Sequence, residues 1–186
     1  MNFIEKKIFE YLENFKNKNF AIGFSGGNDS SCLLLILKNL GFKITPVFVK
    51  TELTEESLKL AKKNANLIGF NLEIINLNVF KNKEIRFNTK LRCYYCKRLM
   101  YGKIKEKFED KIILDGTNYT DTFSFRPGIK ALKELGIISP FMECKIEKKE
   151  ILKYLEINFP ELISEPTSCF ATKYPYDTDL LRLKNG

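Results

Sequence analysis

The sequence contains no histidine among its 186 residues. This absence excludes His-based catalytic triads, a histidine general base and every metal site that depends on a histidine ligand. Any metal ion or cluster would have to be held by cysteine, aspartate or glutamate side chains.

Apolar runs of membrane-spanning length are also missing. The apolar stretch 32–37 is bounded by Ser31 and Lys38, whereas a membrane helix needs about 20 apolar residues. Charges stand at positions 5 to 7, where a secretory signal would need an apolar stretch. We therefore expect a cytoplasmic protein with no membrane partner.

Length and charge limit the remaining classes. A chain of 186 residues with 44% hydrophobic residues fits one globular domain, which can bury a core without disulfides or metal. The net charge of +8 suits a polyanionic partner such as ATP or RNA. The lysines are dispersed among glutamates, with no block of arginines between aromatics, so a dedicated nucleic-acid surface is not favoured.

Strand-like and helix-like patterns alternate along the chain. We expect strands at 20–24, 43–49, 71–75 and 111–115, and helices at 3–16, 30–40, 55–68, 96–108 and 148–158. We expect residues from 116 to the last of these helices to be rich in loops. The alternation predicts a doubly wound α/β domain with a parallel sheet and a ligand site at the carboxyl edge of the strands.

The segment Ser25-Gly-Gly-Asn-Asp-Ser30 lies between a predicted strand and a predicted helix. Glycines there let the backbone approach an anion, and the helix N-terminus supplies free amides. The segment is neither a Walker A loop nor a GxGxxG dinucleotide loop. A glycine-rich turn with Asn28 or Asp29 near a helix cap is the alternative. The whole string resembles the loop of the PP-loop ATP pyrophosphatases, which cleave ATP between its α and β phosphates.

Cys93 and Cys96 form a CxxC pair in the segment Arg92–Lys97. Such a pair can be redox-active, or half of a zinc or iron–sulfur site. The pair does not follow an N-terminal βαβ strand, which argues against a thioredoxin-like role. Cys169 stands far downstream in the segment 166–176. Cys32, in an apolar helix, is expected in the core, and Cys144 has no assigned role.

Several segments together resemble one branch of the PP-loop superfamily. Besides the phosphate loop and the three cysteines, they are 115–118, 125–128, 132–136 and 139–141. The chain resembles the LarE-type sulfur transferases, which help to make the nickel-pincer nucleotide cofactor of lactate racemase. The resemblance runs from about residue 5 to residue 177. It implies a single PP-loop domain over 1–186, with the family's C-terminal region and its oligomer contacts largely absent. A homo-oligomer is nevertheless expected.

The resemblance implies roles for particular residues. The ATP phosphates would be held by Ser25, Gly26, Gly27, Asp29 and Ser30, and the nucleotide pocket lined by Gly116 and Thr117. Asp29 would orient the loop or help to hold Mg²⁺. In the family a substrate carboxylate is adenylated, pyrophosphate leaves, and sulfur then displaces AMP. The catalytic residues would be Asp29, Ser30 and Cys169.

The cysteine set implies the kind of sulfur delivery. Some family members sacrifice the sulfur of one cysteine, which matches Cys169; others use three cysteines, matching Cys93, Cys96 and Cys169, to bind a [4Fe–4S] cluster. The resemblance therefore implies the cluster type, and Zn²⁺ with a fourth ligand such as Cys144 is the alternative. We expect the three thiols to converge beside the phosphate loop, with Cys96 opening a helix whose amides lower the thiolate pKa values.

The acceptor follows from the resemblance alone. It would be a pyridinium dicarboxylate mononucleotide; the sulfide donor stays unidentified. Two alternatives remain: thiolation of tRNA, and a non-catalytic module that binds a nucleotide or carries sulfide. Arg126 could contact a phosphate or carboxylate, or be an exposed loop arginine.

Overall fold

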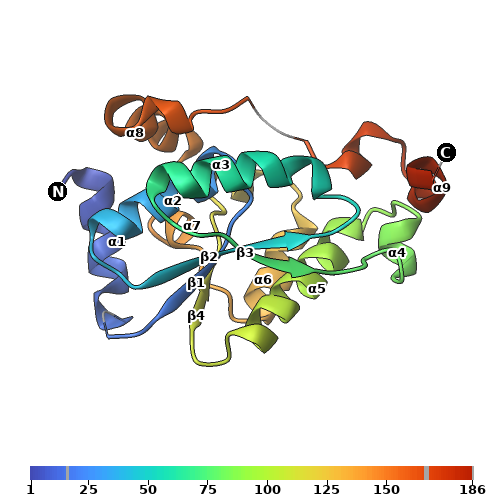
Figure 1. Ribbon diagram of the computed structural model, residues 1–186, viewed down its shortest axis with the longest axis horizontal. Coiled ribbons are helices and arrows are strands. Elements are labelled where there is room, and N and C mark those ends of the chain that lie inside the picture. Colours follow the sequence, from blue (N-terminus) through green and yellow to red (C-terminus); the bar gives the residue numbers. More distant parts are fainter. Residues whose placement is uncertain (16, 166–167, 186) are drawn as a thin grey trace.

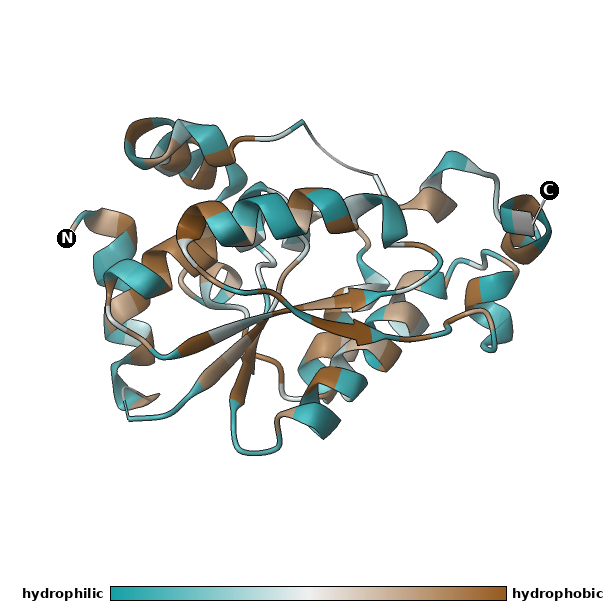
Figure 2. Ribbon diagram, viewed as in Figure 1, coloured by the Kyte–Doolittle hydropathy of each residue, from teal (hydrophilic) through white to brown (hydrophobic). Residues whose placement is uncertain are grey.

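The computed structural model describes residues 1–15, 17–165 and 168–185. The described chain contains a four-stranded parallel sheet in the order β3-β2-β1-β4 (Figure 1). The strands are β1 (Phe20–Gly23), β2 (Ile44–Lys50), β3 (Glu73–Asn76) and β4 (Ile112–Leu114). Brown apolar residues run along all four in Figure 2, as expected of a sheet that is covered on both faces.

The strand order places a topological switch point beside β1. The chain moves outward from β1 to β2 and β3, then returns to pair β4 with the other side of β1. An isolated parallel bridge between Leu114 and Ile138 extends the sheet past β4. Open α/β sheets bind ligands beyond the carboxyl ends of the strands at such a point. The loops after β1 and β4 are therefore the place to look for a site.

Helices cover both faces of the sheet (Figure 1). One face carries α1 (Phe3–Leu12), α2 (Asn28–Asn39), α3 (Leu58–Ile68), α7 (Pro140–Glu143) and α8 (Lys148–Asn158). The other face carries α5 (Arg92–Lys107) and α6 (Pro127–Glu134). None of the helices in the described ranges combines the length and the apolar character that crossing a bilayer requires.

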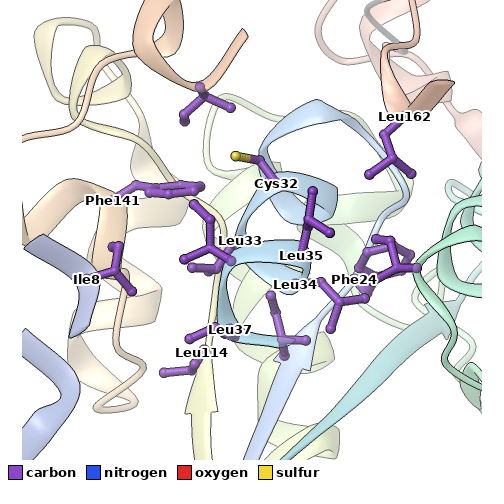
Figure 3. Packing of buried hydrophobic residues seen from close by; sticks show 14 of the residues in the cluster. Ile8, Phe24, Cys32, Leu33, Leu34, Leu35, Leu37, Leu114, Phe141 and Leu162 are labelled. Atoms are coloured by element: carbon purple, nitrogen blue, oxygen red, sulfur yellow. The ribbon is translucent and has the colours of Figure 1, made fainter. Parts of the chain in front are cut away.

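Helix α2 is the centre of the larger core (Figure 3). Its residues from Cys32 to Leu37 are all buried, because α1, α3, α7 and α8 surround it. Cys32 is fully buried, as expected from the sequence, and burial raises the pKa of its thiol well above the ordinary value. A helix that is apolar on every side has no surface for solvent. Its N-terminus is thus held rigidly at the switch point.

A third apolar group, here called the edge core, lies outside the two faces of the sheet. It is formed by Leu53, Val79, Phe80, Ile85, Phe170, Ala171 and Leu180. These residues bring together α4 (Lys83–Arg86), the short 3-10 helix η5 (Phe170–Lys173) and α9 (Leu180–Asn185), at one end of the molecule in Figure 1. The edge core therefore joins the segment that follows Cys169 to the segment that precedes the CxxC pair.

Most predicted elements are present, with shifted boundaries. The region after residue 116 is less loop-rich than expected, because α6 and α7 each begin at a proline in the first helical turn, where proline is tolerated. Helix α5 begins at Arg92 instead of Cys96, since the amide of Tyr95 already donates to the carbonyl of Leu91 at 3.2 Å. The CxxC pair therefore lies within the helix.

Candidate active site

A cavity of about 460 Å³ lies beyond the carboxyl ends of β1, β2 and β4. Its walls come from the phosphate loop, the carboxyl end of β2, the loop after β4, one side of α5 and the first turns of α6. The polar lining residues used below are Ser25, Asp29, Ser30, Cys93, Lys97, Tyr101, Asp115, Thr117 and Arg126. Apolar side chains, including Phe48, Met100 and Leu132, line the rest. A mixed lining of this kind is typical of a site for a nucleotide-sized ligand.

The phosphate loop is fixed from behind. Gly26 has φ +79°, and a Cβ atom there would lie 2.5 Å from the Cα atom of Ala61 in α3. The carbonyl oxygen of Gly26 accepts hydrogen bonds from Asn64 Nδ2 at 2.7 Å and Ser31 Oγ at 3.2 Å. Only glycine fits both the conformation and the close approach. The loop therefore has one well-defined shape.

The serines of the loop face one another at the start of α2. Ser25 Oγ and Ser30 Oγ are 3.2 Å apart, the amide of Gly27 donates to Ser25 Oγ at 3.3 Å, and Ser30 Oγ donates to the carbonyl of Gly27 at 3.2 Å. Gly27 is the N-cap residue and provides no side-chain cap. The first amides of α2 are left for a ligand, and an anion is the group they favour.

Asp29 is held by two residues that the sequence analysis missed. Lys148 Nζ, at the first residue of α8, lies 2.5 Å from Asp29 Oδ1, and Asn118 Nδ2 donates to Asp29 Oδ2 at 3.0 Å. Lys148 is 119 residues away along the chain, so no local pattern signals this pair. With both oxygens occupied, Asp29 could approach Mg²⁺ only if the lysine moves aside.

The loop after β4 meets the phosphate loop directly. A Cβ atom on Gly116 would lie 3.0 Å from the amide nitrogen of Ser30, so the two backbones are in contact. The amide of Thr117 donates to Asp115 Oδ1 at 2.9 Å, which fixes this turn. The structure thus brings Gly116 and Thr117 beside Asp29 and Ser30, although more than 80 residues separate them.

Asp115 is the hub of a buried polar network. Its Oδ2 atom accepts hydrogen bonds from Lys97 Nζ at 3.0 Å and Tyr101 Oη at 3.1 Å, and its Oδ1 atom accepts from Ser139 Oγ at 2.8 Å. Burial alone would raise the pKa of Asp115, but the Lys97 charge and the hydrogen bond from Thr117 outweigh burial and lower it. Burial opposes the charge of Lys97 as well, yet Asp115 raises the pKa of the ammonium. The cavity therefore contains a lysine that is held in its charged form.

Asp115→Asn should make this electrostatic contribution visible as a pH dependence. The folded-state pKa of Asp115 is below its ordinary value of 3.8, so its stabilisation is present above that pH and is lost as the pH falls through the folded value. The difference in unfolding free energy between wild type and variant should be constant from about pH 5 to 8 and should shrink below about pH 3.8. Urea titrations at several pH values measure it. A difference that does not change in acid would contradict the assignment.

Gly23, the last residue of β1, is required by Tyr101. A Cβ atom there would lie 2.2 Å from Tyr101 Oη and 2.6 Å from Cζ. Gly23→Ala should displace the ring, break its hydrogen bond to Asp115 and destabilise the protein by about 1–3 kcal/mol. Gly102→Ala is the control: no atom lies within 4 Å of its added Cβ, and alanine in a helix interior stabilises by about 1 kcal/mol. Thermal unfolding of both variants tests this, and equal midpoints would contradict it.

The three predicted cysteine ligands lie near one another but differ in exposure. Cys93 is exposed and lines the cavity, Cys169 is exposed at the N-cap of η5, and Cys96 is half-buried in the second turn of α5. Burial, together with negative charge on Cys169 or Cys93, raises the pKa of Cys96 to about 12. Desolvation of the thiol group also raises the pKa of Cys169, although the residue as a whole is exposed. The expected lowering of the thiol pKa values by helix amides is therefore wrong for Cys96 and Cys169, because burial dominates.

The described residues form no ready site for a single metal ion. Among residues 1–15, 17–165 and 168–185, no three Cys, Asp or Glu side chains are arranged around a point where one metal ion would bind. Cys144 is not near the other cysteines' helix: its thiol contacts the Lys7 carbonyl of α1 at 3.5 Å, within the α2 side of the structure. Cys144 as a fourth zinc ligand is therefore wrong. Pro166 and Thr167 of the Cys169 segment lie outside the described residues.

Arg126 stands at the rim of the cavity. Its Nη2 atom pairs with Asp121 Oδ1 at 3.0 Å, and 58% of its side chain is exposed. Because it both lines the cavity and is exposed, the structure is consistent with each of the two interpretations of this arginine.

No protein-family model matches the chain. Several curated relatives do, of which two are described first. An uncharacterised protein of Methanocaldococcus jannaschii is 37% identical over 175 residues, which cover 90% of this chain and 66% of the relative. The pyridinium-3,5-bisthiocarboxylic acid mononucleotide synthase of Lactiplantibacillus plantarum is 28% identical over 167 residues, or 86% of this chain and 60% of that enzyme. The chain thus spans about two thirds of the length of these relatives.

Among solved structures, an NMN synthetase of Francisella tularensis has a TM-score of 0.63 at 18% identity, covering 97% of this chain and 79% of that one. This similarity and the switch-point loop define the fold of the PP-loop ATP pyrophosphatases, which confirms the predicted fold class. More distant similarities include tRNA-5-methyluridine(54) 2-sulfurtransferases and GMP synthases. The match to the Lactiplantibacillus synthase agrees with the expected resemblance to the LarE-type branch of this superfamily.

Proposed function

We propose that this chain forms the ATP-binding and sulfur-delivering part of a LarE-type sulfur transferase. The observation that carries the proposal is that one cavity is lined both by the phosphate loop and by a cysteine, Cys93. A mere nucleotide-binding module would not need a thiol there. The similarity to the Lactiplantibacillus synthase over 86% of the chain supports the same conclusion.

The ATP phosphates would bind at the switch point. Ser25 and Ser30 offer hydroxyl donors, the first amides of α2 offer backbone donors, and Gly116 leaves room for close approach. Asp29 would help to hold Mg²⁺ once Lys148 turns from the carboxylate to a phosphate. The apolar wall formed by Phe48, Met100 and Leu132 offers a surface for the adenine ring.

The proposed reaction has two steps. A carboxylate oxygen of the acceptor attacks the α-phosphorus of ATP, the bond to the β-phosphate oxygen breaks, and pyrophosphate leaves. A hydrosulfide sulfur then attacks the carboxyl carbon, the carbon–oxygen bond to AMP breaks, and a thiocarboxylate forms. Lys97, held charged by Asp115, would balance the negative charge that develops in the cavity.

The cysteines fit an iron–sulfur cluster by donor type. Cys93, Cys96 and Cys169 are near enough that negative charge on Cys93 or Cys169 raises the pKa of Cys96, and they are not arranged around one ion. A [4Fe–4S] cluster, when bound, would supply a replaceable sulfur, so that no cysteine is consumed. The chain's own part would be to present Cys93 at the cavity, with Cys96 and Cys169 as the further ligands.

The acceptor we propose is the pyridinium dicarboxylate mononucleotide, by analogy with the product that the Lactiplantibacillus enzyme's name states. Transfer to tRNA is the alternative, favoured only by the more distant tRNA sulfurtransferase relatives. In both cases we propose that the protein acts as a homo-oligomer.

The test is a thiolation assay under anaerobic conditions with ATP, Mg²⁺ and sulfide. One arm contains the pyridinium dicarboxylate mononucleotide and the other contains unmodified tRNA. We expect AMP, pyrophosphate and a thiocarboxylate in the first arm. An ATP analogue with a methylene group between the α and β phosphates is the control, since it can bind but cannot release pyrophosphate. Sulfur in tRNA alone would reverse the choice of acceptor. No AMP in either arm would indicate a non-catalytic module.

A further inference from the structure

The segment that follows Cys169 is held by the side chain of Asn88, just before α5. Asn88 Nδ2 lies 3.2 Å from the carbonyl oxygen of Ala171, 3.1 Å from that of Tyr174 and 2.6 Å from that of Pro175. An amide has two N–H groups, so these acceptors share them. One buried side chain therefore binds several backbone carbonyls of the Cys169 segment.

The same side chain also contacts the CxxC helix. Asn88 Oδ1 accepts a hydrogen bond from Arg92 Nη1, and Arg92 Nη2 donates to Cys93 Sγ at 3.3 Å. Asn88 is fully buried and Arg92 is 7% exposed, so water competes little for the bond between these two side chains. A continuous chain of hydrogen bonds thus runs from Cys93 through Arg92 and Asn88 to the carbonyls after Cys169.

The backbone of Asn88 is adapted to this role. Its φ of +52° is in the left-handed region, which asparagine tolerates better than most residues. This conformation turns the chain sharply between α4 and α5 and directs the side chain at η5. Phe170 and Ala171 pack in the edge core on the same segment. Packing against the edge core is non-directional, whereas the Asn88 bonds fix the register of the Cys169 segment.

We propose that Asn88 and Arg92 form a clamp that sets the distance between Cys93 and Cys169, which makes Asn88 a positioning residue for the sulfur site. The role of the clamp in sulfur delivery rests on the proposed function. The part of the proposal that concerns the distance between Cys93 and Cys169 rests on the hydrogen bonds alone. Asn88 itself touches no substrate. It acts through the backbone of the Cys169 segment and through Arg92.

The experiment measures the distance between the thiols without any cofactor. In full-length protein with Cys96→Ala and Cys144→Ala, the two exposed thiols are Cys93 and Cys169, and Cys32 is buried. After chelation and reduction, a short bifunctional thiol reagent should join Cys93 to Cys169. Adding Asn88→Gly keeps the left-handed backbone but removes the side chain. We expect the cross-linking rate to fall by about tenfold or more, because several buried hydrogen bonds are lost together.

Lys145→Gly is the matched control, since Lys145 also has a positive φ, of +55°, but is exposed and lies after α7. With Lys145→Gly added, the Cys96→Ala, Cys144→Ala protein should cross-link at its original rate. Asn88→Asp is the second variant, because aspartate also tolerates this conformation. It keeps the acceptor for Arg92 but lacks the amide donor, and it should cross-link as slowly as Asn88→Gly. If the circular dichroism spectrum shows that Asn88→Gly does not fold, the cross-linking rate of Asn88→Asp is the test of the clamp.

A cross-linking rate that is unchanged in a folded Asn88 variant would overturn the clamp. Iron and sulfide analysis of the protein with all its cysteines separates the two proposals. Slow cross-linking in the Asn88 variants, with no iron bound by wild type, would keep the clamp and reject the iron–sulfur assignment. Iron binding by wild type that is lost in Asn88→Asp would support both.

Discussion

Replacing any one of Cys93, Cys96 and Cys169 by alanine is expected to abolish repeated sulfur transfer while ATP binding is retained. Cys93 lines the same cavity as the phosphate loop, and the other two thiols lie close enough to influence each other's ionisation. A site with three protein ligands does not survive the loss of one, so we expect a reduction of at least about a hundredfold, the upper range of what loss of one ligand-shell partner costs. The measurement is thiocarboxylate formed per protein over many turnovers, beside ATP affinity by calorimetry.

Cys144→Ala is the control for these variants. Cys144 contacts Lys7 in the core on the α2 side of the sheet, so its loss should leave sulfur transfer unchanged. A Cys169→Ala protein that still transfers sulfur catalytically would contradict the three-cysteine assignment. A single turnover in wild type, followed by loss of one sulfur from Cys169, would instead indicate that this cysteine is consumed.

Ser30→Ala and Asp29→Asn should lower the rate of AMP and pyrophosphate release by about a hundredfold or more, as loss of one preorganised group facing a developing charge does. Ser30 faces Ser25 across the turn, and Asp29 bonds to Lys148 and Asn118, so both belong to the phosphate end of the cavity. Pyrophosphate release can be followed continuously with a coupled assay. Circular dichroism should show an unchanged fold, since neither side chain is part of the apolar core.

Asp110→Asn matches the charge change of Asp29→Asn without touching the site. Asp110 is exposed and precedes β4, at the amino end of the sheet. Pyrophosphate release should equal that of wild type in this variant. Equal rates in Asp29→Asn and Asp110→Asn would show that the loop does not act on the phosphates of ATP.

The sequence was sufficient to predict the fold and the loop because both depend on local signals. Apolar strands separated by amphipathic helices predict a parallel sheet, and the boundaries of β1 and β2 differ from the prediction by at most one residue at each end. The need for glycine at position 26 is also local, because its φ of +79° lies in the left-handed region that favours glycine. The fold class and the family resemblance are confirmed. The extent of the domain and the roles of the site residues stay predictions.

The contacts that complete the site could not be read from the sequence. The partners of Asp29, Asp115 and Asn88 include residues that are 119, 24 and 83 positions away. No local or periodic sequence pattern indicates a contact between residues that are so far apart along the chain. The raised pKa of Cys96 was missed for a related reason: burial comes from segments that are remote in the chain, and it outweighs the local effect of the helix amides.

Helix α8 reaches the phosphate loop through one ion pair, Lys148 with Asp29, at its first residue. The buried residues of α8 are Ile151, Tyr154 and Leu155, which pack within the α2 core. When a phosphate takes Lys148 from Asp29, the helix loses one attachment to the loop and gains another through the ligand. Amide hydrogen exchange at the start of α8 should therefore change when ATP binds, while exchange in the buried centre of α2 stays the same. A probe placed on α8 would report occupancy of the loop from the opposite end of the chain.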